Sequence, residues 1–212
     1  MNRPIARMIT FALALAAGAI SGGTPIAAAT EPARAIFAGG CFWCVEAAFD
    51  AVPGVMATNP GYTGGTVPAP TYEQVSAGGT GHAEAVEVLY DPQRIGYRQL
   101  LAVFWRNIDP HDANGQFCDH GNQYRSAIFA VDAEQRRLAE DSLRALATSG
   151  LLDRPIVTQI AAAGPFYAAE EYHRDYHLKN PARYKFYRWN CGRDQRLDAV
   201  WGGIGTLPFE VN

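Results

Sequence analysis

The chain has 212 residues, of which 48% are hydrophobic, 18 are Lys or Arg and 21 are Asp or Glu. This conventional apolar fraction, without repeats or low-complexity runs, indicates one globular domain with a sizeable core. A net charge of −3 excludes a general electrostatic attraction to nucleic acid or to anionic lipid.

The first residues have the pattern of a secretory signal peptide. Two early arginines precede an apolar run over residues 8–20, and small residues near Ala29 suit signal peptidase. The run is about a dozen residues long, against the roughly 20 that a membrane span needs. We therefore expect a signal peptide over residues 1–29 and a single catalytic domain over residues 30–212, exported to the periplasm or secreted. The mature chain would carry 16 basic and 21 acidic residues, a net charge of −5.

Two cysteines follow the first predicted strand. Residues 34–38 have the pattern of a short buried strand, and a glycine pair permits a tight turn into a helical run over residues 45–49. If Cys41 lies in the first helical turn, unpaired amides and the helix dipole favour its thiolate. Cys44 is one turn further, with Cβ atoms roughly 5–6 Å apart, so a disulfide needs only a modest adjustment. The spacing favours redox chemistry over a zinc half-site or two core cysteines.

The rest of the chain alternates between strand and helix patterns. Strands are expected over residues 55–62, 82–90, 125–131 and 156–161. Helices are expected over residues 72–75, 97–107 and 133–149, and helical pieces from residue 168 lead into coil after residue 201. This order predicts an α+β fold, a compact two-layer sandwich with a mixed sheet of about five strands, a ferredoxin-like core and a long C-terminal coil. A doubly wound parallel sheet fits less well.

One carboxyl group falls on an apolar strand face. His82, Glu84, Val86 and Val88 share a face because side chains alternate along a strand. A carboxyl group beside two valines tends to have a raised pKa and can donate a proton near neutral pH. The alternative is that Glu84 is simply exposed near the start of the strand. We expect His82 at the surface or in a cap, without a chemical role.

Three polar segments carry weaker signals. The loop over residues 116–125 lies just before a strand, where sites are often built, but it could equally be a solvated connection. His173 and His177 have ligand-like helical spacing, yet Arg174 stands where the metalloprotease signature requires Glu, so no metal site is expected. The basic, aromatic run over residues 183–189 is typical of single-strand nucleic-acid binders. In an acidic, exported chain we interpret it instead as packing with snorkelling cations.

Together these features resemble a peptide-methionine sulfoxide reductase of the A type. The matching motifs occur in family order, at family-like spacing, from about Arg34 to Trp201. They cover residues 40–43, 61–65, 70–72, 80–86, 90–92 and 121–126, with a weaker match at residues 179–181. The resemblance implies reduction of methionine S-sulfoxide to methionine without flavin, nicotinamide or metal.

The resemblance also implies roles for individual residues. Cys41 would attack the sulfoxide sulfur and become a sulfenic acid, while Glu84 supplies a proton. Donors aimed at the departing oxygen would act where negative charge develops. The substrate-binding residues implied are two phenols, a carboxylate and two aromatic walls: Tyr72, Tyr124, Asp119, Phe42 and Trp43.

The cysteines depart from the commoner family pattern. Many relatives have Gly at the position of Cys44 and a resolving cysteine near the C-terminus, where this tail has only Cys191. The chain resembles the subclass in which the second motif cysteine resolves the sulfenic acid, giving a Cys41–Cys44 disulfide. Cys191 is the alternative, and Cys118 stays open. In an oxidising compartment, pairing of Cys41 with Cys44 would leave Cys118 and Cys191 for a structural disulfide.

The expected partners follow from this chemistry. They are a thioredoxin-like reductant, which reopens the disulfide, and methionine sulfoxide in peptides or proteins. We expect a monomer that binds neither nucleic acid nor membranes. Two other classes fit the cysteine pair: a thiol-disulfide oxidoreductase, which would not need Glu84, Tyr72 and Tyr124, and a zinc-stapled binding module.

Overall fold

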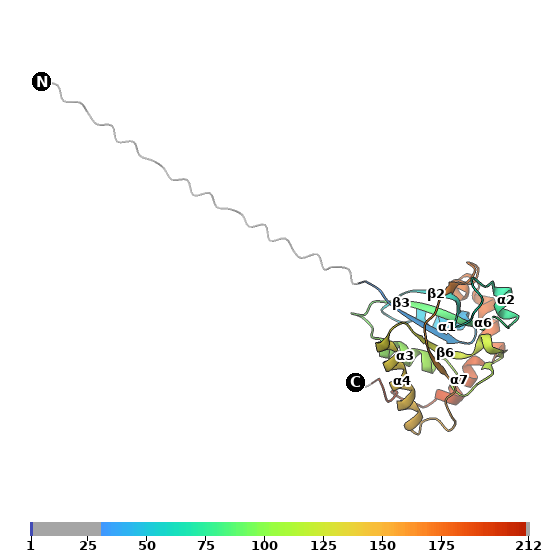
Figure 1. Ribbon diagram of the computed structural model, residues 1–212. Coiled ribbons are helices and arrows are strands. Elements are labelled where there is room, and N and C mark those ends of the chain that lie inside the picture. The colour runs from blue at the N-terminus through green and yellow to red at the C-terminus, as the bar shows by residue number, and fades with distance from the viewer. Residues whose placement is uncertain (2–30, 211–212) are drawn as a thin grey trace.

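The computed structural model of the chain describes residue 1 and residues 31–210. Apart from Met1, the expected signal peptide lies outside the described residues. The main sheet has the strand order β7-β6-β1-β3-β2-β8. Its strands are β1 (Ala33–Gly39), β2 (Val55–Thr63), β3 (Ala83–Tyr90), β6 (Ser126–Ala130), β7 (Gln159–Ala162) and β8 (Tyr167–Ala168). Figure 1 labels β2, β3 and β6 of this sheet.

The helices lie close to the ranges that periodicity predicts. They are α1 (Phe42–Asp50), α2 (Tyr72–Ser76), α3 (Tyr97–Arg106), α4 (Ala133–Thr148), α5 (Tyr176–Lys179), α6 (Pro181–Asn190) and α7 (Arg193–Trp201). The long polar loop after α3 contains the short ladder of β4 (Gly115–Gln116) and β5 (Asp119–His120) and the 3₁₀ turn η1 (Asn122–Tyr124). Within the described residues, no helix is long and apolar enough to cross a membrane.

The ferredoxin-like core is confirmed. The segment β1-α1-β2-β3-α3-β6 forms four antiparallel strands in the order β6-β1-β3-β2. Two edges are added: β7 runs parallel to β6 after the crossover through α4, and β8 pairs antiparallel with β2. The main sheet thus has six strands where about five were expected, because the two-residue β8 is too short to leave a periodic pattern in the sequence.

The helices cover one face of the sheet. On β1, Phe37 points to this face and stacks on Phe49 of α1 and Phe104 of α3, with ring centroids 4.9 and 5.2 Å apart. Alternate residues such as Ile36 point to the opposite face and pack with a smaller cluster around Phe129. This is the two-layer arrangement that the alternation of elements predicts.

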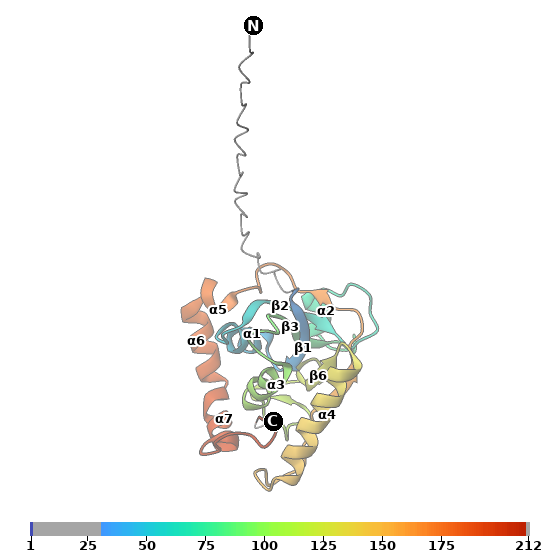
Figure 2. The same cartoon turned by 90° about the vertical axis from the view of Figure 1, so that its left-hand side faces the viewer.

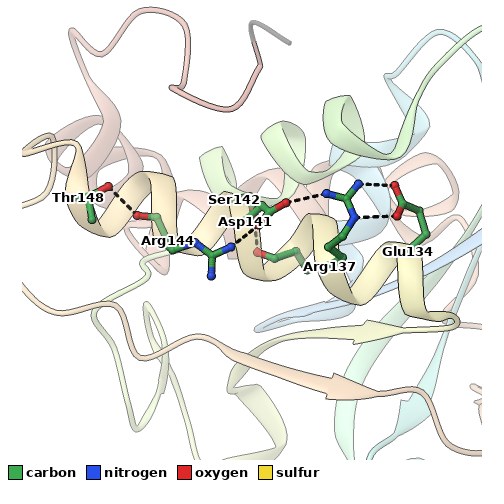
Figure 3. A network of polar contacts seen from close by, with 7 residues as sticks. Glu134, Arg137, Asp141, Ser142, Arg144 and Thr148 are labelled. Carbon is green, nitrogen blue, oxygen red and sulfur yellow. Dashed lines mark hydrogen bonds and ion pairs between the residues drawn. The ribbon is translucent and has the colours of Figure 1, made fainter.

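Helix α4 is held at its inner face and carries charge on its outer face. Its N-cap is Asp132, whose side chain accepts a hydrogen bond from the amide of Gln135. Ser142 accepts a hydrogen bond of 3.0 Å from the indole of Trp105 on α3. On the exposed side, Figure 3 shows ion pairs among neighbouring turns. Such exposed pairs contribute only about 0–1 kcal/mol each, so burial of the inner face holds the helix in place.

The C-terminal region has the expected helical pieces, followed by a short irregular end. Helices α5, α6 and α7 follow one another along one side of the molecule, with α4 on the opposite side (Figure 2). Irregular structure begins only at residue 202, so the expected long coil is confined to the last described residues. Even there the chain packs tightly, because Leu207 and Phe209 are buried in the main core.

The basic, aromatic run forms α6 and has two different faces. Tyr184, Tyr187 and Arg188 face inward at i, i+3 and i+4 spacing. Phe186 and Trp189 face solvent, with 65% and 70% of their surface exposed. The expectation that this run packs inward is therefore wrong for these two side chains.

Candidate active site

The turn between β1 and α1 presents Cys41. Gly40 has a φ of +81°, and a Cβ atom there would lie 2.6 Å from the Cβ of Gln116, so the turn requires glycine. Cys41 is the N-cap of α1 and is 6% exposed. Because β1 is paired on both sides, by β3 and β6, the sulfur is held on a rigid support.

Glu84 lies beneath the first turn of α1. As the alternation predicts, it shares the helix-covered face of β3 with valines, and only 2% of it is exposed. One carboxyl oxygen accepts a hydrogen bond of 3.1 Å from the amide of Phe42. Burial raises the pKa of Glu84 to about 8, with the charge of Asp119 adding to the shift. The group is therefore mostly protonated at neutral pH and can donate a proton.

The pKa values of the two cysteines shift in opposite directions. Burial raises the pKa of Cys41, and Cys44 and Glu84 raise it further. The pKa of Cys44 falls to about 6, mainly because the Cys41 thiol donates a hydrogen bond to it. These opposite shifts favour the thiolate on Cys44 over the thiolate on Cys41.

This distribution differs from the expected thiolate on Cys41. The main physical reason is burial, which disfavours the charged form of Cys41 and raises its pKa. In addition, the sulfur makes no side-chain capping bond, and the first amide of α1, at Phe42, bonds to Glu84 instead. Cys44 is one helical turn away, with its amide bonded to the Cys41 carbonyl at 3.0 Å.

A cavity of about 250 Å³ opens onto these groups. It brings together seven residues named from the sequence, and an eighth that was not: Cys41, Phe42, Trp43, Tyr72, Glu84, Asp119, Tyr124 and Tyr187. Burial raises the pKa of Tyr72 to about 12 and also raises that of Tyr124, so both phenols keep their protons. Within the described residues neither hydroxyl has a hydrogen-bond partner, and both can donate to a ligand.

Residues of the C-terminal region hold the aromatic wall of the cavity in place. The indole of Trp43 stacks on Tyr176 at 3.7 Å and donates a hydrogen bond of 3.0 Å to Nδ1 of His173. His173 is buried, which lowers its pKa to about 4 and keeps the ring neutral, as an acceptor must be. Its ring also lies 4.9 Å from Phe42. His173 therefore supports the wall and is not free for the metal binding that its spacing suggested.

Two of the polar lining residues are held by groups that the sequence analysis did not identify. Glu170 accepts a hydrogen bond of 2.8 Å from the amide of Tyr72 and another of 2.8 Å from the hydroxyl of Tyr62. On the other side of the cavity, Tyr187 donates a hydrogen bond to Asp119 and lies beside the Cys41 sulfur. Inward-facing tyrosines at i and i+3, after a proline helix start, were the available signal for Tyr187.

Known proteins share this sequence and this structure. The family model "Peptide methionine sulfoxide reductase" matches residues 33–203. A relative from Ligilactobacillus salivarius, "Peptide methionine sulfoxide reductase MsrA", is 54% identical over 79% of this chain and 96% of its own length. "Peptide methionine sulfoxide reductase MsrA 2" of Caulobacter vibrioides is 49% identical over 92% of this chain and 98% of its own.

The chain belongs to the peptide methionine sulfoxide reductase A family. Solved structures agree. Mxr1 from Saccharomyces cerevisiae in reduced form has a TM-score of 0.65 at 33% identity, covering 72% of this chain and 87% of that one. Methionine sulfoxide reductase A of Corynebacterium diphtheriae has a TM-score of 0.63 at 34% identity, covering 73% and 77%.

This member of the reductase family holds its other two cysteines in a disulfide. Cys118 and Cys191 are bonded across 73 residues of sequence, whereas Cys41 and Cys44 are free. Cys191 caps the end of α6 and Cys118 directly precedes Asp119, so the bond ties the C-terminal helices to the rim of the cavity. In this state Cys191 has no free thiol, while Cys44 lies next to Cys41.

His82 lies in the interior of this reductase and not at the surface, and its ring binds backbone groups of a loop. It is 2% exposed. Its Nδ1 accepts a hydrogen bond of 3.2 Å from the amide of Gly65, and its Nε2 lies 2.7 Å from the carbonyl of Val67. The imidazole thus holds the glycine-rich loop that follows β2.

Two groups of acidic or sulfur ligands lie together in the described part of the reductase. The sulfurs of Cys118 and Cys191, near Asp119, are consumed by their disulfide. Glu46 and Asp50 of α1 lie near Asp175, and His177 approaches the two carboxylates at 3.9 and 3.6 Å. Oε1 of Glu46 accepts a hydrogen bond of 3.0 Å from the amide of Asp175, whereas its Oε2 is buried without a hydrogen-bond partner. This second group connects α1 to the segment that begins α5.

Proposed function

We propose that the protein reduces the S epimer of methionine sulfoxide to methionine, with Cys41 as the nucleophile. The observation that carries this is one cavity that joins a nucleophilic sulfur, a protonated carboxyl group and two donor phenols beside an aromatic wall. Phe42 and Trp43 would hold the methyl group. Tyr72 and Tyr124 would donate hydrogen bonds to the sulfoxide oxygen as it gains negative charge.

The first step follows from this geometry. Cys41 attacks the sulfoxide sulfur while its own proton passes to Cys44, and Glu84 protonates the oxygen. Methionine leaves, and the oxygen remains on Cys41 as a sulfenic acid. Cys44 then displaces it as water, giving a Cys41–Cys44 disulfide. Cys44 is favoured over Cys191 because it is one helical turn away, whereas Cys191 is bonded to Cys118.

The experiment supplies each epimer of N-acetylmethionine sulfoxide to the purified protein with dithiothreitol. We expect turnover of the S epimer alone, and none in Cys41→Ser. Turnover of the R epimer alone, or full activity in Cys41→Ser, would contradict the proposal. A thiol-disulfide oxidoreductase would instead reduce insulin without turning over sulfoxide, and it would not need the carboxyl group and the two phenols that line the cavity.

The resolving step has a separate test. Sulfenic acid is trapped with dimedone after one turnover in Cys44→Ser and in Cys191→Ser. We expect it to accumulate in Cys44→Ser only. Accumulation in Cys191→Ser only would transfer the resolving role to the tail.

We infer that a thioredoxin-like dithiol protein reopens the disulfide. A dithiol reductant is favoured because the product is an intramolecular disulfide. The first thiol of the reductant forms a mixed disulfide with the protein, and its second thiol then releases the reduced protein. Coupling turnover to thioredoxin and its reductase should support multiple cycles, whereas glutathione with glutaredoxin should not. We also propose that the protein is a monomer. Light scattering during gel filtration tests this.

Export is a further part of the proposal. It is supported by the two early arginines and the apolar run that follows. Cell fractionation followed by N-terminal sequencing should yield a mature protein that starts near Thr30. Intact protein in the cytoplasm would contradict it.

A further inference from the structure

Three carboxyl groups from two distant segments meet beside α1. Glu46 and Asp50 lie one helical turn apart on this helix, and Asp175 directly precedes α5. One oxygen of each group lies within 4.8 Å of the other two. Negative charges at such distances repel one another, so the group is stable only if protons or a cation offset them.

One of these carboxyl groups is fully buried and only half satisfied. None of the surface of Glu46 is exposed. Its Oε1 accepts a hydrogen bond of 3.0 Å from the amide of Asp175, whereas its Oε2 is buried without a hydrogen-bond partner. Burial raises the pKa of Glu46 to about 7, and the charges of Asp50 and Asp175 add to the shift. A buried carboxyl oxygen without a partner is costly, so Oε2 needs a ligand that carries positive charge.

The described residues do not place a basic side chain in contact with this oxygen. His177 is the only basic residue among them within 4.0 Å of the three carboxyl groups. Its Nδ1 lies 3.9 Å from Oε2 of Glu46 and its Nε2 lies 3.6 Å from Oδ2 of Asp50, and both distances are too long for a hydrogen bond. The guanidinium of the nearby Arg174 donates a hydrogen bond of 2.6 Å to the side chain of Asn59 instead.

A cavity gives an ion access to the group from solvent. It has a volume of about 290 Å³, and Asp50 and Asp175 both line it. Thr58, which also lines the cavity, donates a hydrogen bond of 2.6 Å to Oδ1 of Asp50. This bond orients the carboxyl group and leaves Oδ2 for an ion.

The spacing of the three carboxyl groups favours Ca²⁺ among the hard cations that carboxylates bind. Oxygen ligands lie about 2.3–2.6 Å from Ca²⁺, so two ligands on opposite sides of the ion can be roughly 5 Å apart. Mg²⁺ holds its ligands at about 2.0–2.1 Å, which spans only about 4 Å, and it needs near-ideal octahedral geometry. The range of 4.8 Å within which the oxygens lie therefore fits Ca²⁺ better.

We propose that Glu46, Asp50 and Asp175 bind a Ca²⁺ ion that fastens the start of α5 to α1, with water completing the coordination from the cavity. The site differs from the one that the spacing of His173 and His177 suggested, because its ligands are carboxylates from two distant segments. The ion also fixes the residue after Asp175, which is Tyr176, whose ring stacks on Trp43 at 3.7 Å. Ca²⁺ would thus stiffen the aromatic wall of the cavity, and this last consequence rests on the proposed function.

Isothermal titration calorimetry measures Ca²⁺ binding to the full chain after treatment with EGTA and desalting. We expect saturable binding with a Kd on the order of 10⁻⁴–10⁻³ M, and weaker binding of Mg²⁺. Asp175→Asn removes one charge and keeps the local backbone, because Asn tolerates the φ of +52° found there. It should weaken Ca²⁺ binding about tenfold or more. Asp153→Asn, at an aspartate whose side chain is 90% exposed, is the matched control and should bind like the wild type.

Thermal unfolding is a second readout, since a ligand that binds only the folded state raises Tm. Ca²⁺ at 10 mM should raise the Tm of the wild type and of Asp153→Asn by about 3 °C or more. The rise should be less than about 1 °C in Asp175→Asn and in Asp50→Asn, which keeps an oxygen that can accept from Thr58. With N-acetylmethionine S-sulfoxide as substrate, Ca²⁺ should lower KM in the wild type with little change in kcat.

Separate results overturn each part of the inference. Absence of saturable Ca²⁺ binding by the wild type up to 10 mM overturns the site, and tighter binding of Mg²⁺ than of Ca²⁺ overturns the choice of ion. Equal affinity in the wild type and in a folded Asp175→Asn or Asp50→Asn would show that the ion binds elsewhere. If turnover occurs and Ca²⁺ leaves KM unchanged, the effect on the aromatic wall is refuted. Absence of sulfoxide turnover refutes the proposed function and leaves the binding result standing.

Discussion

Glu84 shows how a single buried side chain sets the pH range of the site. Activity needs Glu84 protonated and Cys44 ionised. Glu84, with a pKa of about 8, keeps its proton below pH 8, and Cys44, with a pKa of about 6, loses its proton above pH 6. The two conditions overlap between these values. We expect a bell-shaped dependence of kcat/KM on pH, with an acid limb near 6 and a basic limb near 8.

Replacing Glu84 by Gln tests this assignment. The amide keeps the shape but cannot donate the proton, so activity should fall by about 10²–10⁴-fold and the basic limb should disappear. Because the folded pKa of Glu84 lies above its ordinary value of 4.5, its contribution to stability is present below pH 4.5 and is lost as pH rises through 8. Chemical denaturation at pH 5 and pH 8.5 measures the free energy of unfolding. The decrease between these two pH values should be smaller in Glu84→Gln than in the wild type. An unchanged basic limb in the variant would contradict the assignment.

Tyr187 is a second residue-scale test. Its ring meets Trp43 edge-on at 5.7 Å, and its hydroxyl donates to Asp119. Tyr187→Phe keeps the ring contact but removes a hydrogen bond to a carboxylate, a contribution of about 1.5–3 kcal/mol. We expect kcat/KM to fall about tenfold or more, mainly through KM, with little change in melting temperature. Tyr172→Phe, at an exposed tyrosine, is the control, and equal effects in the two variants would refute the role.

At the scale of elements, local periodicity predicts what lies close together along the chain. The strand before Cys41, the alternation that buries Glu84 and the helical period of α3 are local patterns, and all are found in the structure. The contacts of α5 to α7 with the site were not predicted. Hydrogen bonds join Trp43 to His173, just before α5, across 130 residues and Asp119 to Tyr187, in α6, across 68. No local period encodes such sequence separations.

The disulfide between Cys118 and Cys191 adds a covalent bond between the C-terminal helices and the loop that precedes Asp119. Because it ties the junction of α6 and α7 to the rim of the cavity, replacing both cysteines by Ser should cost about 2–4 kcal/mol of stability. We expect a raised KM through a less fixed Tyr187 and Asp119. Sulfenic acid should still be resolved, through Cys44. Chemical denaturation and dimedone trapping measure the two effects, and persistent sulfenic acid in this variant would show that Cys191 resolves it.

On the scale of the whole molecule, the last described residues pack into the main hydrophobic core. Leu207 is fully buried, and the indole of Trp201 donates a hydrogen bond of 2.8 Å to the carbonyl of Ile108 at the end of α3. Leu207→Ala should therefore destabilise the protein by about 2–5 kcal/mol, through lost burial and the cavity left behind. Leu178→Ala, at a leucine with 68% exposure, should change stability by less than about 0.5 kcal/mol. Similar unfolding midpoints for the two variants would show that the tail does not belong to the core.

The small volume of the substrate cavity has a consequence for the proteins on which this enzyme would act. About 250 Å³ accommodates one oxidised side chain but no folded surface around it. A damaged methionine inside a client's own core must first swing out, so its repair would proceed at the rate of local opening in that client. The rate of repair would therefore depend on the local flexibility of the substrate protein. Oxidised methionines in frayed or loosely packed segments would be reduced quickly, and those in rigid interiors would persist.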